Sequence, residues 1–76
     1  MAEGWKGHLQ AEIRRRWPVG AKFSLDIDIY KLTPLFSHLY PRNHHVEDKL
    51  RQTLQYLRDD GFVEFMGNGA YRRIAD

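Results

Sequence analysis

The apolar positions in the second half of the chain have the spacing of an α-helix. Val46, Leu50, Leu54 and Leu57 follow one another at steps of four, four and three residues. Side chains at these intervals share one face of a helix, and the residues between them are mostly polar. The pattern therefore predicts an amphipathic helix over residues 45–60 with one buried stripe.

Capping residues and a hairpin signal flank this helix. Asn43 suits the N-cap, and Gly61 suits the position where a left-handed backbone ends a helix. Residues 62–65 and 70–74 are expected to be strands, and the Gly-Asn-Gly run within residues 66–69 tolerates the positive φ angles of a tight turn. A long helix followed by a glycine-rich hairpin is typical of the end of a winged helix.

A second helical pattern opens the chain. Trp5, Leu9, Ile13 and Trp17 recur at steps of four, and Pro18 follows as a stop. Three consecutive arginines close this helix, where cations suit the helix dipole. The residues before Trp5 carry no pattern, and we expect residues 1–4 to be frayed.

The segment between the two long helices is less regular. We expect a three-residue strand ending at Ser24, which then acts as the N-cap of a short helix over residues 25–31. Pro34 would disrupt a helix interior, so Thr33 and Pro34 are expected to be the N-cap and first residue of a new piece over residues 34–39. The side chains expected to face inward from that piece are Leu35, Phe36 and Leu39.

The order of these elements predicts one small α+β domain over residues 1–76. It is a winged helix-turn-helix domain with three helices, the second broken near Pro34, a short strand and a C-terminal β-hairpin wing. A chain of 76 residues buries only about 60% of its unfolded surface, so the core must be compact. No apolar run approaches the roughly 18 residues of a membrane span.

Composition argues against catalytic and metal chemistry. The chain has no cysteine, which fits a reducing compartment and excludes disulfides and thiolate ligands. Its four histidines do not have the spacing of a zinc site, and no nucleophile-base constellation stands out. We therefore expect no catalytic residue, no metal and no cofactor. The net charge of +2 permits binding to nucleic acid without arguing strongly for it.

Several groups of residues carry a resemblance to a known family. They are Phe23-Ser24-Leu25 with Tyr30, Tyr40-Pro41-x-Asn43-x-His45-Val46, the run LRQxLQxLRDxG over residues 50–61, and Glu64-Phe65 with Gly69-x-Tyr71-Arg72. Over residues 22–73 the chain resembles the C-terminal winged-helix domain of the Dam-replacing family of restriction endonucleases. Residues 1–21 match less clearly.

This resemblance implies binding to double-stranded DNA. For the best-known members of the family it implies recognition of GATC that carries N6-methyladenine. The carboxylate pair and catalytic lysine of the family's nuclease have no room in this chain. We therefore expect a binding module, not an enzyme, that is linked to or associated with a nuclease domain in the cytoplasm of a prokaryote, near the nucleoid. A monomer is expected, because no second apolar stripe remains for a dimer.

Recognition helices usually present their first turns to base edges, which points to the start of the long helix. Arginine suits guanine, glutamine suits adenine, an aspartate can accept from cytosine, and an imidazole face of a histidine could meet the methyl group. The wing supplies a second set of candidates, of which one of the two adjacent arginines should face solvent. The candidate DNA-binding residues are His44, His45, Asp48, Arg51, Gln52, Asn68, Arg72 and Arg73.

Other interpretations of the same residues remain open. Any surface helix has a polar face, and Arg51 or Arg58 could pair with an acidic neighbour one turn away. A winged-helix transcription regulator that is indifferent to methylation would have the same pattern. A winged helix that binds protein is the third candidate, because acidic residues along the long helix offset its cations. Loss of binding at high salt would separate DNA binding from protein binding.

Overall fold

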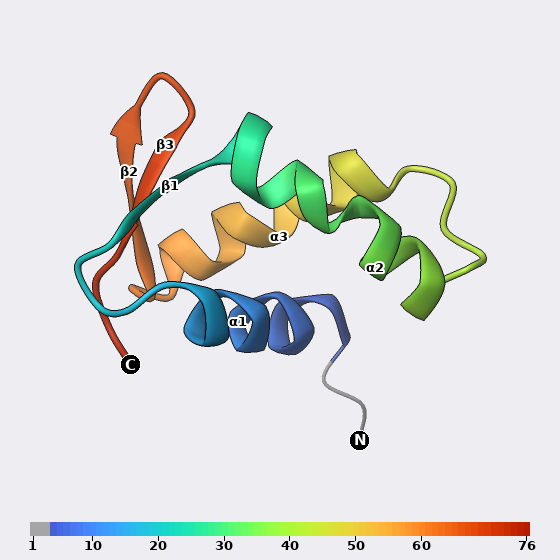
Figure 1. The fold of residues 1–76 in the computed structure, drawn as a ribbon, viewed down its shortest axis with the longest axis horizontal. Coiled ribbons are helices and arrows are strands. Elements are labelled where there is room, and N and C mark those ends of the chain that lie inside the picture. The colour runs from blue at the N-terminus through green and yellow to red at the C-terminus, as the bar shows by residue number, and fades with distance from the viewer. Residues whose placement is uncertain (1–3) are drawn as a thin grey trace.

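The computed structural model describes residues 4–76 as three α-helices, a short irregular helical segment and a three-stranded sheet (Figure 1). The elements in chain order are α1 (Gly4–Arg16), β1 (Lys22–Ser24), η1 (Leu25–Ile29), η2 (Tyr30–Leu32), α2 (Thr33–Leu39), α3 (Val46–Asp59), β2 (Val63–Gly67) and β3 (Ala70–Arg73). Gly4, expected to be frayed, is the first residue of α1. The same expectation for residues 1–3 lies outside the described part of the chain.

The sheet is antiparallel, and its strands lie in the order β1-β3-β2. Tyr71 of β3 is paired with Phe23 on one side and Phe65 on the other. The short strand predicted to end at Ser24 is present as β1 and lies beside the hairpin. The tip of the hairpin uses Asn68 at a φ of 53° between two glycines that also have positive φ. An irregularity between Phe65 and Gly67 then shifts the register of β2.

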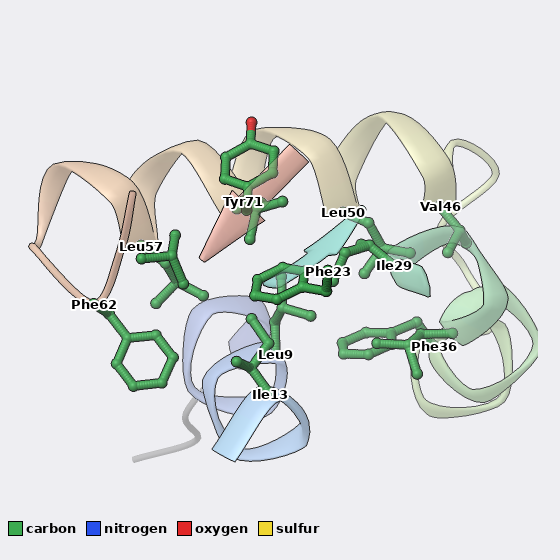
Figure 2. Packing of buried hydrophobic residues seen from close by; sticks show 13 residues of the cluster. Leu9, Ile13, Phe23, Ile29, Phe36, Val46, Leu50, Leu57, Phe62 and Tyr71 are labelled. Atoms are coloured by element: carbon green, nitrogen blue, oxygen red, sulfur yellow. The ribbon is translucent and has the colours of Figure 1, made fainter. Parts of the chain in front are cut away.

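The core lies where α1, α3 and the inner face of the sheet meet, and Figure 2 shows its side chains from close by. Both predicted apolar stripes are confirmed: Leu9 and Ile13 of α1 and the stripe of α3 are buried, and the two tryptophans of the first stripe pack against them. The buried hydrophobic residues are Leu9, Ile13, Phe23, Ile29, Leu32, Phe36, Val46, Leu50, Leu54, Leu57, Phe62, Val63 and Tyr71.

The middle segment is helical throughout and differs from the expected break. Ser24 is the N-cap of η1, and its side chain accepts a hydrogen bond from Ile27 N as predicted. A π turn, a 3₁₀ turn and α2 then follow without an extended residue between them. Thr33 has helical angles, and Leu32 takes the N-cap position of α2 in its place. Pro34 lies in the first turn, where its missing N–H leaves no intrahelical hydrogen bond unmade.

One inward-facing side chain of this segment was predicted wrongly. Phe36 is fully buried and Leu35 packs against the core, but Leu39 is exposed. Leu39 is the last residue of α2, and the chain leaves the helix at Tyr40, whose ring takes the inner position against Trp5 at a centroid distance of 4.4 Å. An aromatic ring from the following turn therefore covers the space that Leu39 was expected to fill.

The two ends of α3 differ in how well the sequence predicted them. Asn43 is not the N-cap: His45 takes that position, and the side chain of Asn43 instead accepts a hydrogen bond from His45 N over 2.7 Å. Gly61 ends the helix at a φ of 82°, as expected. Phe62 N donates to Leu57 O and Gly61 N donates to Arg58 O, which is the Schellman pattern.

This architecture is a small α+β winged helix-turn-helix. In it, α3 is the long helix that α1 and α2 support, and the β2–β3 hairpin is the wing. Figure 1 shows the tip of the wing and the start of α3 toward one edge of the molecule, with α1 and the C-terminus toward the other. The fold thus places the first turns of α3 and the wing tip on one side.

Candidate nucleic-acid interface

An open depression of about 600 Å³ lies at the start of α3. It is formed by the turn after α2 and by the first two turns of α3, whose opposite face is held in the core by Val46 and Leu50. The residues that line it are Arg42, Asn43, His44, His45, Asp48, Lys49, Arg51 and Gln52. All five candidates that the sequence placed on this helix and its preceding turn line this one depression, together with three that it did not name.

A second depression of about 410 Å³ adjoins the first on the side of α2. Asn43, His44, His45 and Asp48 line both depressions, so the two histidines stand in the wall between them. Both histidines are exposed. Their imidazole rings are therefore accessible from either side, which is the position required of a side chain that contacts a ligand in the larger depression.

The charged groups of the larger depression lack ion-pair partners. Arg42, Asp48, Lys49 and Arg51 take part in no ion pair within residues 4–76, and Lys49 Nζ makes only a long contact of 3.5 Å with Gln52 Oε1. The ion pairs of the described residues all lie elsewhere, as with Arg58 and Asp59 at the far end of α3. The charges at the start of α3 are therefore available to an external partner.

The turn that carries the histidines is anchored to the body of the domain. Tyr40 stacks on Trp5 and Phe36, and its hydroxyl contacts the ring of His8. Burial raises the pKa of the Tyr40 phenol above its ordinary value. Anchoring at Tyr40 and the hydrogen bond from His45 N to Asn43 give the turn a defined path into α3.

Tyr30 is a neighbour of this site that sequence reasoning did not select. Burial raises the pKa of its phenol, the positive charge of Arg51 opposes that shift, and the negative charge of Glu47 reinforces it. The charges that act on the phenol belong to Asp26 and to side chains of the first half of α3. Tyr30 is the first residue of η2, in the helical segment before Pro34, and the local sequence pattern there gave no separate signal of a site.

Arg72 is the wing arginine that faces outward. Its guanidinium donates to the carboxylate of Glu64 across β3 and β2, through Nε at 3.0 Å and through a second, shorter contact. The side chain is partly exposed, at 39%. Asn68 is exposed at the turn itself. Both residues thus lie on accessible parts of the wing, although the charge of Arg72 is already offset by Glu64.

Arg73 is buried, which corrects the expectation that it would flank the wing as a DNA contact. Its side chain follows the inner face of β3 because side chains alternate along a strand. There it donates to Trp17 O at 2.8 Å and to Ala75 O at 2.9 Å, and it lies over the ring of Phe62. Arg73 holds the end of α1 to the sheet and is not part of the accessible surface.

The family comparison adds to this geometry. A family model described as the Dam-replacing HTH domain matches residues 18–73. The chain belongs to this family. The matched residues begin after α1 and include the turn, all of α3 and the wing, in agreement with the resemblance over residues 22–73.

As a Dam-replacing HTH domain, the protein is a DNA-binding module of the helix-turn-helix type. Within residues 4–76, no group of three or more histidine, cysteine, aspartate or glutamate side chains is arranged to hold a metal ion. None of the helices in that part of the chain is long and apolar enough to cross a membrane. The side chains that line the depression on α3 carry charged and hydrogen-bonding groups.

The donor and acceptor set of the Dam-replacing HTH domain suits the edges of bases. Arg51 can donate two hydrogen bonds to guanine, Gln52 can both donate to and accept from adenine, and Asp48 can accept from the amino group of cytosine. These three residues lie within little more than one turn of α3. Recognition helices of the helix-turn-helix type present such groups to base edges from their first turns.

Proposed function

We propose that the domain is the DNA-recognition module of a restriction endonuclease and that it recognises N6-methyladenine in a GATC-type site. In this proposal the start of α3 enters the major groove and the wing follows the adjacent backbone. The nuclease is a separate domain, linked to this one or associated with it. The observation that carries the proposal is the set of uncompensated charges around the depression on α3, within a domain of the Dam-replacing HTH family.

The chemistry of the target fits the residues in the depression. GATC contains one guanine, one adenine, one thymine and one cytosine on each strand, and the major-groove edges of guanine, adenine and cytosine match Arg51, Gln52 and Asp48. A methylated adenine keeps one amino hydrogen and adds an apolar group. His44 and His45 are exposed and line the depression, so the flat face of an imidazole ring can pack against that methyl group.

The test is fluorescence anisotropy with three short duplexes at about 100 mM salt, where phosphate contacts still contribute. The duplexes carry fully N6-methylated GATC, unmethylated GATC, and N6-methyladenine in an unrelated sequence. Binding that is at least tenfold tighter to the first duplex, or about 1.4 kcal/mol, is the expected result.

The other outcomes define the competing functions. Equal binding to all three duplexes would contradict methyl recognition and favour a DNA-binding regulator that is indifferent to methylation. An absence of binding to any duplex would contradict DNA recognition. It would favour a protein partner, which the mixed charge of α3 also permits.

A further inference from the structure

The tip of the wing carries no charge, and Asn68 is its one polar side chain. Residues 65–70 read Phe-Met-Gly-Asn-Gly-Ala and contain no charged side chain. Phe65 is 49% exposed and Met66 is 41% exposed. Farther down the hairpin, the guanidinium of Arg72 is engaged by Glu64. A wing built in this way cannot clamp the DNA backbone mainly by charge.

The tip is held in a fixed position. Leu25 N at the start of η1 donates to Gly69 O over 2.9 Å, and Phe65 lies against Tyr71 at a ring-centroid distance of 5.3 Å. Tyr71 in turn lies against Phe23 in the core side of the sheet. The exposed apolar surface is therefore presented by a supported hairpin, and contacts made by it would cost little ordering entropy.

We propose that the wing contacts DNA through Phe65 and Met66, which pack on the apolar surface of deoxyribose rings and base edges. This inference rests on the proposed function. Two observations favour DNA as the occupant: the wing tip and the start of α3 lie toward the same edge of the molecule, and no acidic side chain within residues 65–70 would repel phosphates (Figure 1). Apolar side chains of DNA-binding proteins contact the thymine methyl group, and phenylalanine and methionine are among those that insert at base steps.

A protein partner or a second copy of the chain fits the tip less well. An aromatic side chain offers about 150–250 Å² in total, so half-exposed Phe65 leaves roughly 100 Å² free. Met66 adds a similar amount at most. A stable protein interface needs about 800 Å² on each partner, several times this area. The patch is too small to form an interface alone and is suited to supplement one formed by α3.

The experiment measures binding to methylated GATC duplex over a range of salt concentrations. Its variants are Met66→Gln, Phe65→Ala and Arg51→Ala. Ile74→Gln is the matched control, because Ile74 follows the same hairpin, is 43% exposed and lies at the opposite end from the tip. Thermal unfolding of each variant checks that the domain remains folded.

Met66→Gln and Phe65→Ala are expected to weaken binding roughly tenfold, the factor that corresponds to about 50–60 Å² of lost apolar contact. The slope of log affinity against log salt should stay as in the wild type, because no phosphate contact is lost. Arg51→Ala removes a cation from the depression and should instead make that slope shallower. The control should bind as the wild type does.

Two results would overturn the inference. If folded Met66→Gln and Phe65→Ala bound within about twofold of the wild type, the wing tip would not contact DNA. If they changed the salt slope instead, the wing would act through charge. Both results leave wild-type binding intact and are therefore distinct from failure of the proposed function, in which the wild type itself would not bind the duplex.

Discussion

The guanidinium of Arg73 donates a hydrogen bond to the carbonyl oxygen of Trp17 over 2.8 Å, across 56 residues of sequence. The bond joins the last strand to the chain just after α1. A further donor of the same group bonds to Ala75 O, and the cation lies over the ring of Phe62 with a distance of 5.4 Å to its centroid. Arg73 is thus a structural residue that links three parts of the fold.

Loss of the Arg73 side chain should destabilise the domain. Arg73→Ala leaves backbone carbonyls without their donor in a site where the residue is only 6% exposed, and we expect a loss of about 2–3 kcal/mol in the free energy of unfolding. Arg72→Ala, on the outer face, should cost less than roughly 1 kcal/mol. Urea denaturation followed by circular dichroism measures both. Equal stability of the two variants would contradict the assignment of Arg73 to the interior.

The left-handed end of α3 predicts a second stability effect. Gly61 has a φ of 82°, which a residue with a Cβ adopts at a cost of about 1–2 kcal/mol. Gly61→Ala should lower stability by that amount, and Gly61→Asn should lose less because asparagine tolerates this conformation. Thermal unfolding of the two variants gives the order. A Gly61→Ala variant as stable as the wild type would show that the end of α3 relaxes to another path.

The acid stability of α1 should depend on Glu12. Burial acts to raise the pKa of this carboxyl, but hydrogen bonds from Arg15 and Arg16 outweigh it, and the pKa falls below its usual value of 4.5. A lowered pKa in the folded state means that the stabilisation is present above pH 4.5 and is lost as the pH falls through the folded value.

The Glu12→Gln variant tests this dependence. It should be less stable than the wild type at pH 7, and the difference should shrink as the pH falls below 4.5. Urea denaturation at a series of pH values from neutral to acid measures the two curves. A difference that stays constant over that range would show that the ion pairs with Glu12 do not contribute to folding.

Two arginines on α3 allow a controlled test of where the helix binds DNA. Arg51 lines the depression without an ion-pair partner in the described residues, whereas Arg58, nearly two turns later, is paired with Asp59. Arg51→Ala should weaken binding to methylated GATC by about 1–3 kcal/mol, and Arg58→Ala should change it little. Anisotropy titrations at one salt concentration give both values. The reverse order would move the interface toward the end of α3.

The histidine pair should control methyl discrimination. If an imidazole ring packs against the N6-methyl group, His44→Ala or His45→Ala should lower the ratio of affinities for methylated and unmethylated GATC. Affinity for the unmethylated duplex should change less, because the hydrogen-bonding residues remain. The measurement is the ratio itself, taken for each variant and for the wild type. Unchanged ratios in both variants would show that the methyl group is recognised by other residues.

Local patterns in the sequence predicted much of this fold correctly. The stripe from Val46 to Leu57 predicted α3 and its buried face, because the helix repeat alone decides which side chains share a face. Gly61 and the Gly-Asn-Gly run predicted the helix end and the hairpin, because few other residues adopt positive φ readily. The same periodicity brings Asp48, Arg51 and Gln52 together in one depression, and the turn before α3 adds His44 and His45.

Other features depended on contacts between distant parts of the chain. Strand alternation predicted that only one of Arg72 and Arg73 faces solvent, but packing against Trp17 and Phe62 decided that Arg73 is inside. Leu39 is exposed because Tyr40 fills its expected place against Trp5.

The sequence by itself determined the helices, the hairpin and the face of α3 that remains free, since these depend on neighbours a few residues away. The tertiary structure alone decided which polar groups are satisfied within the fold and which are left for a partner. That distinction requires pairs of residues far apart in sequence to meet, as Lys6 meets Asp60 and as no partner within residues 4–76 meets Arg51 in an ion pair.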